Sequence, residues 1–165
     1  MNSLLNKEPV KRAEKSIKEF DQNLKVLCLE QTARTAQDAA TALGCNVGAI
    51  VKSLLLSSGK NFVLCLVSGD KRCSLNKIKN ILNEKDVSMA NPNDVKKITG
   101  YTIGGVSPVG HLSKIKIYID STLERFTNVF AAAGHPNCVF KIEFNQLTKL
   151  TSGEIKEITE WGNQN

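Results

Sequence analysis

The sequence predicts an α+β domain in which helices flank a largely antiparallel or mixed sheet. Helix-like and strand-like segments are intermixed along the chain, and neither a regular β-α-β alternation nor an internal repeat runs through them. No Pro-, Gly- or Ser-rich linker divides the 165 residues. A chain of this length can bury about 70% of its unfolded surface in one core. We therefore expect a single domain over residues 1–165.

The helices are indicated by apolar periodicity and by capping residues. Apolar residues spaced by three or four positions predict an amphipathic first helix. Its apolar face consists of Val10, Ala13, Ile17 and Phe20. A second helix is bracketed by a cap at Thr35–Asp38 and by Gly44, which suits the left-handed residue after a helix. Further helices are expected after Ser74 and between Asn91 and Gly100, and a short helical tail closes the chain.

The strand candidates are short runs rich in apolar and β-branched residues. They span residues 24–29, 49–56, 61–67, 115–119, 127–132 and 138–144. Four turn-forming residues, Ser57–Lys60, separate the second run from the third. A connection of this length predicts an antiparallel hairpin.

Composition and charge exclude some function classes and favour others. The apolar runs are far shorter than the ~20 residues that cross a bilayer, and the first residues lack the apolar core of a secretion signal. We expect a cytoplasmic protein without a membrane partner. The net charge of +6 and the pI near 9.1 favour a polyanionic partner such as RNA, although a basic surface also serves solubility alone.

Metal and cofactor signals are absent from the sequence. The five cysteines are odd in number and form no Cys-x-x-Cys pair, and neither histidine has a second ligand at metal-binding spacing. No dinucleotide or phosphate-loop fingerprint occurs. We expect no metal and no cofactor, and we interpret the cysteines as buried structural residues.

Lys52 is the first candidate functional residue. It lies on a predicted strand, on the same face as Ile50, Leu54 and Leu56. A lysine at a sheet edge whose ammonium reaches water would explain this position without a function. Alternatively, Lys52 is an ammonium on the floor of a pocket, where it holds a ligand oxygen or a phosphate.

The second candidate is the Gly-rich segment from Gly100 to Gly110. Such a loop can bring backbone N–H groups close to a ligand, as an oxyanion hole requires, or it can be an ordinary turn-rich connection. Ser107 is not a serine-hydrolase nucleophile, because Val109 stands where that motif needs Gly and Pro108 has no N–H to offer. We interpret Ser107 as a hydroxyl that orients substrate.

The third candidate is the segment 131–136, in which small residues run into a turn that presents His135. Small side chains leave room for a ligand. A histidine held by its own turn is an equally good interpretation, since no carboxylate is adjacent in sequence to orient it as a base.

Taken in order, six segments of this chain resemble the YbaK family, the prolyl-tRNA synthetase-associated editing domain. They are TAQDAATALGC, IVKSLLL, LVSGDKR, TGYTIGGVSP, IYIDSTL and FAAAGHPNCVF. The resemblance covers about residues 32–150. It implies a mixed fold with a β-barrel-like sheet and an aminoacyl-tRNA deacylase that acts in trans. The implied partners are proline tRNA charged with alanine or cysteine and prolyl-tRNA synthetase.

The same resemblance implies a set of site residues. The strand lysine of the family's pocket corresponds to Lys52, and the loop that holds the substrate carbonyl corresponds to Gly104, Gly105 and Pro108. The substrate-binding positions correspond to Ser53, Asp70, Ser107, Gly134 and His135. A histidine in the last segment is similar to the alanine-directed or small-residue branches, which places cysteine as substrate in doubt.

An aminoacyl ester is already activated, so positioning can suffice for its hydrolysis. Water, the terminal ribose hydroxyl or a group of the substrate attacks while loop amides stabilise the oxyanion and Lys52 anchors the ester end or a nearby phosphate. The alternative function is a tRNA- or synthetase-binding module that has kept the fold without the reaction. Loss of turnover but not of tRNA binding on substitution of Lys52 would separate the two.

Overall fold

The computed structural model describes residues 3–30 and 34–162. Its main sheet has the strand order β1-β8-β7-β2-β3-β6-β9, with β5 added beside β2, and β4 and β10 form a separate pair. The pairings of β2 with β7, β3 with β6 and β6 with β9 are parallel, and the others are antiparallel. The sheet is therefore mixed and mainly antiparallel, as the sequence predicts.

The elements follow one another in this order. They are α1 (Glu8–Phe20), β1 (Val26–Cys28), α2 (Ala36–Leu43), β2 (Ile50–Ser58), β3 (Asn61–Ser68), β4 (Lys71–Cys73), α3 (Leu75–Leu82), β5 (Val87–Met89), α4 (Pro92–Thr99), β6 (Lys116–Asp120), β7 (Asn128–His135), β8 (Cys138–Glu143), α5 (Phe144–Thr151), β9 (Glu154–Lys156) and β10 (Thr159–Trp161). Short 3-10 turns span Ser3–Asn6, Val47–Ala49 and Ser121–Arg125.

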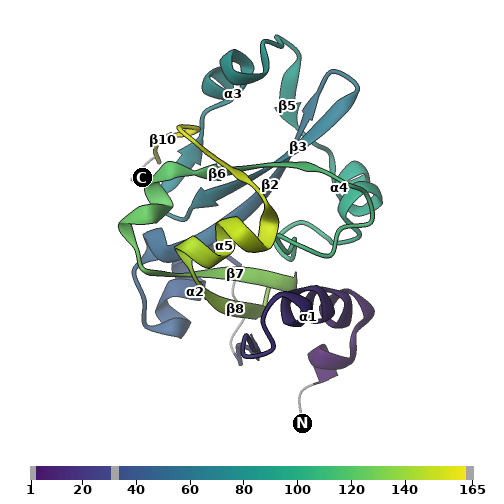
Figure 1. The fold of residues 1–165 in the computed structure, drawn as a ribbon, viewed down its shortest axis with the longest axis vertical. Helices are drawn as coiled ribbons and strands as arrows, with labels where there is room; N and C mark the ends of the chain where they lie inside the picture. Colours follow the sequence, from purple (N-terminus) through teal and green to yellow (C-terminus); the bar gives the residue numbers. More distant parts are fainter. Residues whose placement is uncertain (1–2, 31–33, 163–165) are drawn as a thin grey trace.

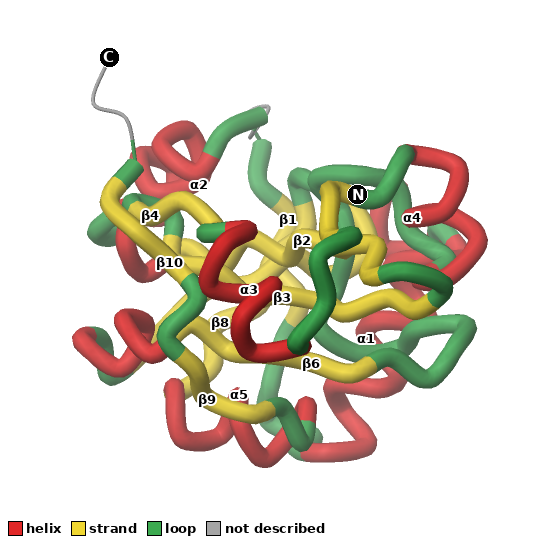
Figure 2. Tube along the Cα trace, turned by 90° about the horizontal axis from the view of Figure 1, so that it is seen from above, coloured by secondary structure: helices red, strands yellow, loops and turns green. Residues whose placement is uncertain are grey.

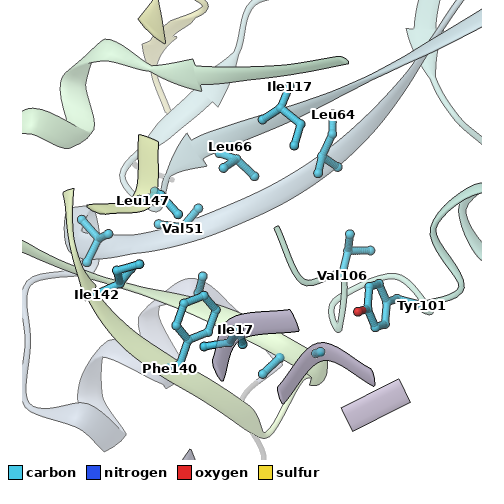
Figure 3. Packing of buried hydrophobic residues seen from close by; sticks show 14 of the residues in the cluster. Ile17, Val51, Leu64, Leu66, Tyr101, Val106, Ile117, Phe140, Ile142 and Leu147 are labelled. Carbon is cyan, nitrogen blue, oxygen red and sulfur yellow. The ribbon is translucent and has the colours of Figure 1, made fainter. Parts of the chain in front are cut away.

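Figure 1 shows α1 beside the β7–β8 end of the molecule, and α3 with β5 at the opposite end. Side chains along β2 and β3 alternate between the two faces of the sheet, so these strands contribute to two separate apolar clusters. Val51 and Leu66 belong to the larger cluster, whereas Leu56 and Val67 pack with α3. In Figure 3, Ile17 of α1 and Phe140 of β8 lie together in the larger cluster.

The caps that the sequence predicts are confirmed. The side chains of Thr35, Ser74 and Asn91 each accept a hydrogen bond from a backbone N–H in the first turn of the helix that follows. These bonds satisfy N–H groups that have no partner inside the helix. The predicted helix boundaries at Gly44 and Gly100 are confirmed too, since both residues are left-handed.

Four expectations need correction. Phe20, expected on the apolar face of the first helix, is 37% exposed. The helix ends at Phe20, and the ring lies beyond the core into which Val10, Ala13 and Ile17 pack. The hairpin turn is shorter than predicted, since β2 and β3 pair as far as Ser58 and Asn61. The strand predicted to end at residue 132 continues to 135, because β7 pairs onward with β8 through an irregularity.

The last correction concerns the end of the chain. Instead of a closing helical tail, α5 is followed by two short strands, β9 and β10. Each has only three residues, too few to show a periodicity, and each depends on a distant partner. β9 pairs with β6, and β10 pairs with β4. Figure 2 shows β10 alongside β4 on the same side of the molecule as α2.

Candidate active site

A cavity of about 760 Å³ opens beside β2. Its wall combines four parts of the chain: β2 itself, the first turn of α2, the segment from Gly69 to Arg72, and the Gly-rich loop at Ile103 and Gly104. Residues of β5, β7, β8 and α4 also line it, as do Val106 and Gly162, which directly follows β10. This volume is within the usual range of small-molecule and cofactor sites, which is about 300–1,000 Å³.

The cavity exists because β2 loses its neighbour on one side. β2 pairs with β7 only at Ile50 and Val51, and β5 pairs on the same side only from Leu56 to Ser58. Among the described strands, none pairs with Lys52–Leu54 on that side, although β3 pairs with them on the other. A central strand therefore presents an open edge, and the cavity lies against it.

Lys52 lies at this opening. Its side chain is half-buried, and its ammonium donates a hydrogen bond to the backbone carbonyl of Lys71. Burial lowers the pKa of the Lys52 ammonium, while the nearby carboxylates of Asp70 and Asp120 act in the opposite direction. The structure thus places a cation in the cavity wall rather than at an outer edge of the sheet.

Ser53 lies next to Lys52 in the same wall. Its hydroxyl is buried and has no hydrogen-bond partner among the described residues. A buried hydroxyl without a partner costs about 1–3 kcal/mol relative to a satisfied one. Ser53 is therefore a polar residue of the cavity wall whose hydrogen-bonding capacity the described protein leaves unused.

Asp70 also lines the cavity, and it is tightly held. Arg125 contacts both of its carboxylate oxygens, at 3.0 Å and 2.8 Å, and the Ser68 hydroxyl donates to one of them at 2.9 Å. The hydrogen bonds from Arg125 hold the pKa of Asp70 below its usual value. Asp70 is therefore an anchor for the segment between β3 and β4.

The Gly-rich loop brings only part of its predicted residues to the cavity. Gly104 lines it with a φ of 88°, in the left-handed region that favours glycine. Gly105 lies behind, where a Cβ would come within 2.9 Å of the Cα of His135, and its N–H already donates to the Thr102 carbonyl. Among the described backbone, the N–H of Gly104 has no such acceptor.

Ser107 and Pro108 lie away from the cavity. The Ser107 side chain is fully buried, and its hydroxyl accepts a hydrogen bond from the N–H of Val109. Pro108 lines a separate hollow, together with His111 and Lys114. These two residues shape the loop.

Gly134 and His135 are likewise set back from the cavity, and only the following Pro136 reaches it. A Cβ on Gly134 would come within 2.6 Å of the backbone of Pro9, so this glycine lets α1 pack closely on β7. The Nδ1 atom of His135 accepts a hydrogen bond from the N–H of Asn137, as expected for a histidine held by its own turn.

Arg12 of α1 holds the Gly-rich loop at both ends. Its guanidinium donates to the carbonyls of Gly100 and Gly110, each at 2.8 Å, and lies over the Tyr101 ring at 4.5 Å. The Tyr101 hydroxyl in turn donates to the Val109 carbonyl at 2.8 Å. In Figure 3, Tyr101 and Val106 of this loop lie side by side.

Sequence reasoning missed Arg12 and Arg125 as residues that position the site. Each contacts a segment 55 or more residues away in the chain. Neither lies in a local motif, so no signal in the sequence could have identified it. Sequence reasoning also assigned no site role to the cations Arg34, Lys71 and Arg72, all of which line the cavity.

The charge of the wall favours an anionic ligand. In the described part of the chain the lining includes four cations, Arg34, Lys52, Lys71 and Arg72, against the single carboxylate of Asp70. No group of three or more metal-ligating side chains occurs among residues 3–30 and 34–162. None of the helices described is long and apolar enough to span a membrane.

Residues 30–150 match the model of the aminoacyl-tRNA editing domain. The chain belongs to that family. The match agrees with the range of about 32–150 predicted from the sequence, and it contains the whole of β2 and the Gly-rich loop. It does not include α1 or β10.

Relatives of this editing-domain protein include both separate proteins and parts of synthetases. It is 30% identical to YwhH of Bacillus subtilis, covering 76% of this chain and 80% of that one. It is 27% identical to a protein of Enterococcus faecalis named as a candidate Cys-tRNA(Pro)/Cys-tRNA(Cys) deacylase, EbsC, over 76% and 77% of the two chains. The proline–tRNA ligase of Fervidobacterium nodosum is 37% identical over 58% of this chain, which spans 16% of that enzyme.

The solved structures agree. One described as a candidate trans-editing enzyme for prolyl tRNA synthetase has a TM-score of 0.89 and 35% identity, over 93% of this chain and 98% of that one. Another, the hypothetical protein APE2540, has a TM-score of 0.83 and 27% identity. These likenesses confirm the mixed fold that the sequence predicts.

Proposed function

We propose that this protein hydrolyses, in trans, the ester that joins a small amino acid to proline tRNA. The observation that supports this most directly is the opening beside β2, where Lys52 and Ser53 line one cavity and the Ser53 hydroxyl has no partner among the described residues. The action in trans is supported by the nearly complete overlap with the candidate trans-editing structure. Proline tRNA is supported by the likeness to proline–tRNA ligases.

The cavity suits a short amino acid. Its apolar wall includes Val51, Phe130, Ala132 and Val139. Phe130 and Val139 restrict the space, while Ala132 leaves room for a methyl or thiol group. Alanine and cysteine both fit this description, and pockets separate such side chains only about 10- to 200-fold. Alanine is our first choice.

In the proposed reaction a water molecule adds to the ester carbonyl carbon, and the bond between that carbon and the ribose oxygen breaks. One proton of the water ends on the ribose oxygen, the other is released to solvent, and the amino acid leaves as its carboxylate. The N–H of Gly104 is available to the oxyanion that develops, and Lys52 holds the ester end or the adjacent phosphate. No protein nucleophile is required, because orientation supplies much of the rate.

The test is the rate at which alanine, cysteine and serine are lost from charged proline tRNA. We expect rapid loss of alanine with the intact protein and little above the uncatalysed rate with Lys52→Ala. Lys60→Ala is a matched control, because Lys60 lies in the exposed turn of the same hairpin. No hydrolysis of any of the three, together with retained tRNA binding, would favour the non-catalytic binding module instead.

A further inference from the structure

Trp161 is the only tryptophan in the sequence, and its side chain is 63% exposed. It lies on β10, directly opposite Lys71 of β4. Tryptophan is usually much more buried, because its ring contributes a large apolar area to a core. The two-stranded sheet of β4 and β10 therefore displays this ring to solvent.

Two cations lie against the ring of Trp161. The Lys71 ammonium lies 3.2 Å from the ring centroid, and the guanidinium carbon of Arg125 lies 5.8 Å from it. Arg72, on the same strand as Lys71, is paired with Glu160 at the surface. Such an arrangement combines an aromatic surface with positive charge, which is the chemistry that binds single-stranded nucleic acid: bases stack on the ring and phosphates contact the cations.

The residues next to the ring line the cavity, although Trp161 itself does not. Lys71, Arg72 and the next residue, Gly162, all line it. The carbonyl of Lys71 accepts the hydrogen bond from Lys52, and its ammonium lies over the Trp161 ring. Lys71 therefore contacts both the cavity wall and the ring. A chain of nucleotides that leaves the cavity on this side would pass over Trp161.

We propose that Trp161 stacks on a base of the unpaired 3′ end of tRNA while Lys71 and Arg72 contact its phosphates. This inference rests on the proposed function, because an ester bound in the cavity fixes where the terminal nucleotide lies. It goes beyond the family match, which ends at residue 150. Inside a duplex the bases are stacked on one another, so only the terminal pair offers a free face, whereas each unpaired nucleotide can offer one.

Fluorescence tests this directly, because Trp161 is the source of all tryptophan emission when excitation is chosen to avoid the two tyrosines. The probe is an uncharged RNA hairpin with four unpaired 3′ nucleotides, compared with the same hairpin with a blunt end. We expect the tailed hairpin to quench the emission and to bind more weakly as salt rises. Equal quenching by the blunt hairpin, or quenching by prolyl-tRNA synthetase and not by RNA, would overturn the proposal.

Kinetics supply the second test. Trp161→Ala is expected to raise the KM for charged tRNA about tenfold, because stacking of one base contributes about that factor or more. It should leave the hydrolysis of a small aminoacyl ester unchanged. Trp161→Phe should restore most of the binding. Ile155→Ala, on β9, is the matched control for the loss of an exposed apolar side chain.

The two proposals fail in different ways. If no charged tRNA is hydrolysed but the tailed hairpin still quenches Trp161, the deacylase function is wrong and the stacking surface stands. If charged tRNA is hydrolysed with the same KM by the intact protein and by Trp161→Ala, the stacking surface is wrong and the deacylase function stands.

Discussion

Two polar groups of residues lie near each other in this protein and behave in opposite ways. The carboxylate cluster consists of Asp120, Asp70 and their hydrogen-bond partners at the ends of β3 and β6. The β2 opening consists of Lys52 and Ser53. Asp120 is fully buried and accepts four hydrogen bonds, from the N–H of Ser68 and of Thr122 and from the hydroxyls of Thr122 and Thr159.

The polar groups of the β2 opening have few hydrogen-bond partners within the described protein. Ser53 has no hydrogen-bond partner within the described chain, and the Lys52 ammonium has one backbone carbonyl. Where polar groups satisfy one another, they fix the fold, because removing one leaves the others buried without partners. Where they face a cavity instead, the same chemistry is available to a substrate.

The largest effect is expected from breaking the carboxylate cluster. Asp120→Ala leaves the buried N–H of Ser68 and the hydroxyl of Thr159 without an acceptor. At about 1–3 kcal/mol for each such group, the free energy of unfolding should fall by about 4 kcal/mol. Urea unfolding measures this, and Asp120→Asn should cost less because its amide oxygen still accepts. A loss below about 1 kcal/mol would show that water replaces the carboxylate.

Substitution in the β2 opening should reduce activity strongly and stability only slightly. Lys52→Met is expected to reduce deacylation by about 100-fold, the usual scale for a group that stabilises charge in the transition state. The free energy of unfolding should stay within about 1 kcal/mol, because the lost hydrogen bond is offset by removal of a partly desolvated charge. Urea unfolding and deacylation rates, measured on one preparation, check both parts. A variant that is both unfolded and inactive would place Lys52 with the carboxylate cluster instead.

Arg12 is a test of how far the site depends on residues outside the family match. Arg12→Ala removes two hydrogen bonds to the ends of the Gly-rich loop and the contact with Tyr101. We expect a loss of about 2 kcal/mol in unfolding free energy and a several-fold lower deacylation rate. Arg12→Lys should recover little, since an ammonium cannot reach both carbonyls in a fork. Lys15→Ala, an exposed change on the same helix, is the control, and an equal effect there would contradict the role of Arg12.

The same contrast explains what the sequence could and could not predict. Lys52 was identifiable because a charge on an apolar strand face is locally anomalous, and helix caps such as Thr35 depend on residues three positions apart. The short strand β10 and the pairing of Arg125 with Asp70 depend on contacts between distant segments. No local pattern encodes such contacts. Gly104 and Ser107 belong to one motif, yet only the fold shows that one faces the cavity and the other the core.

The smallest expected effect concerns the pH dependence of the Asp70–Arg125 pair. Because Arg125 holds the folded-state pKa of Asp70 below its unfolded value of about 4, the pair contributes stability above pH 4. That contribution is lost as pH falls through the folded pKa. Both side chains are partly exposed, so we expect less than about 1 kcal/mol.

Asp70→Asn removes the charge but keeps much of the shape, and it isolates this pair from the rest of the carboxylate cluster. The difference in unfolding free energy between the intact protein and Asp70→Asn should therefore be largest near pH 7 and should shrink toward pH 3. Urea unfolding at pH 7, 4 and 3 gives that difference. If the difference in unfolding free energy stayed constant over this range, Asp70 would stabilise the fold through the shape of its hydrogen bonds and not through its charge. Asp70 would then act by a different mechanism from Lys52, whose proposed role depends on its charge.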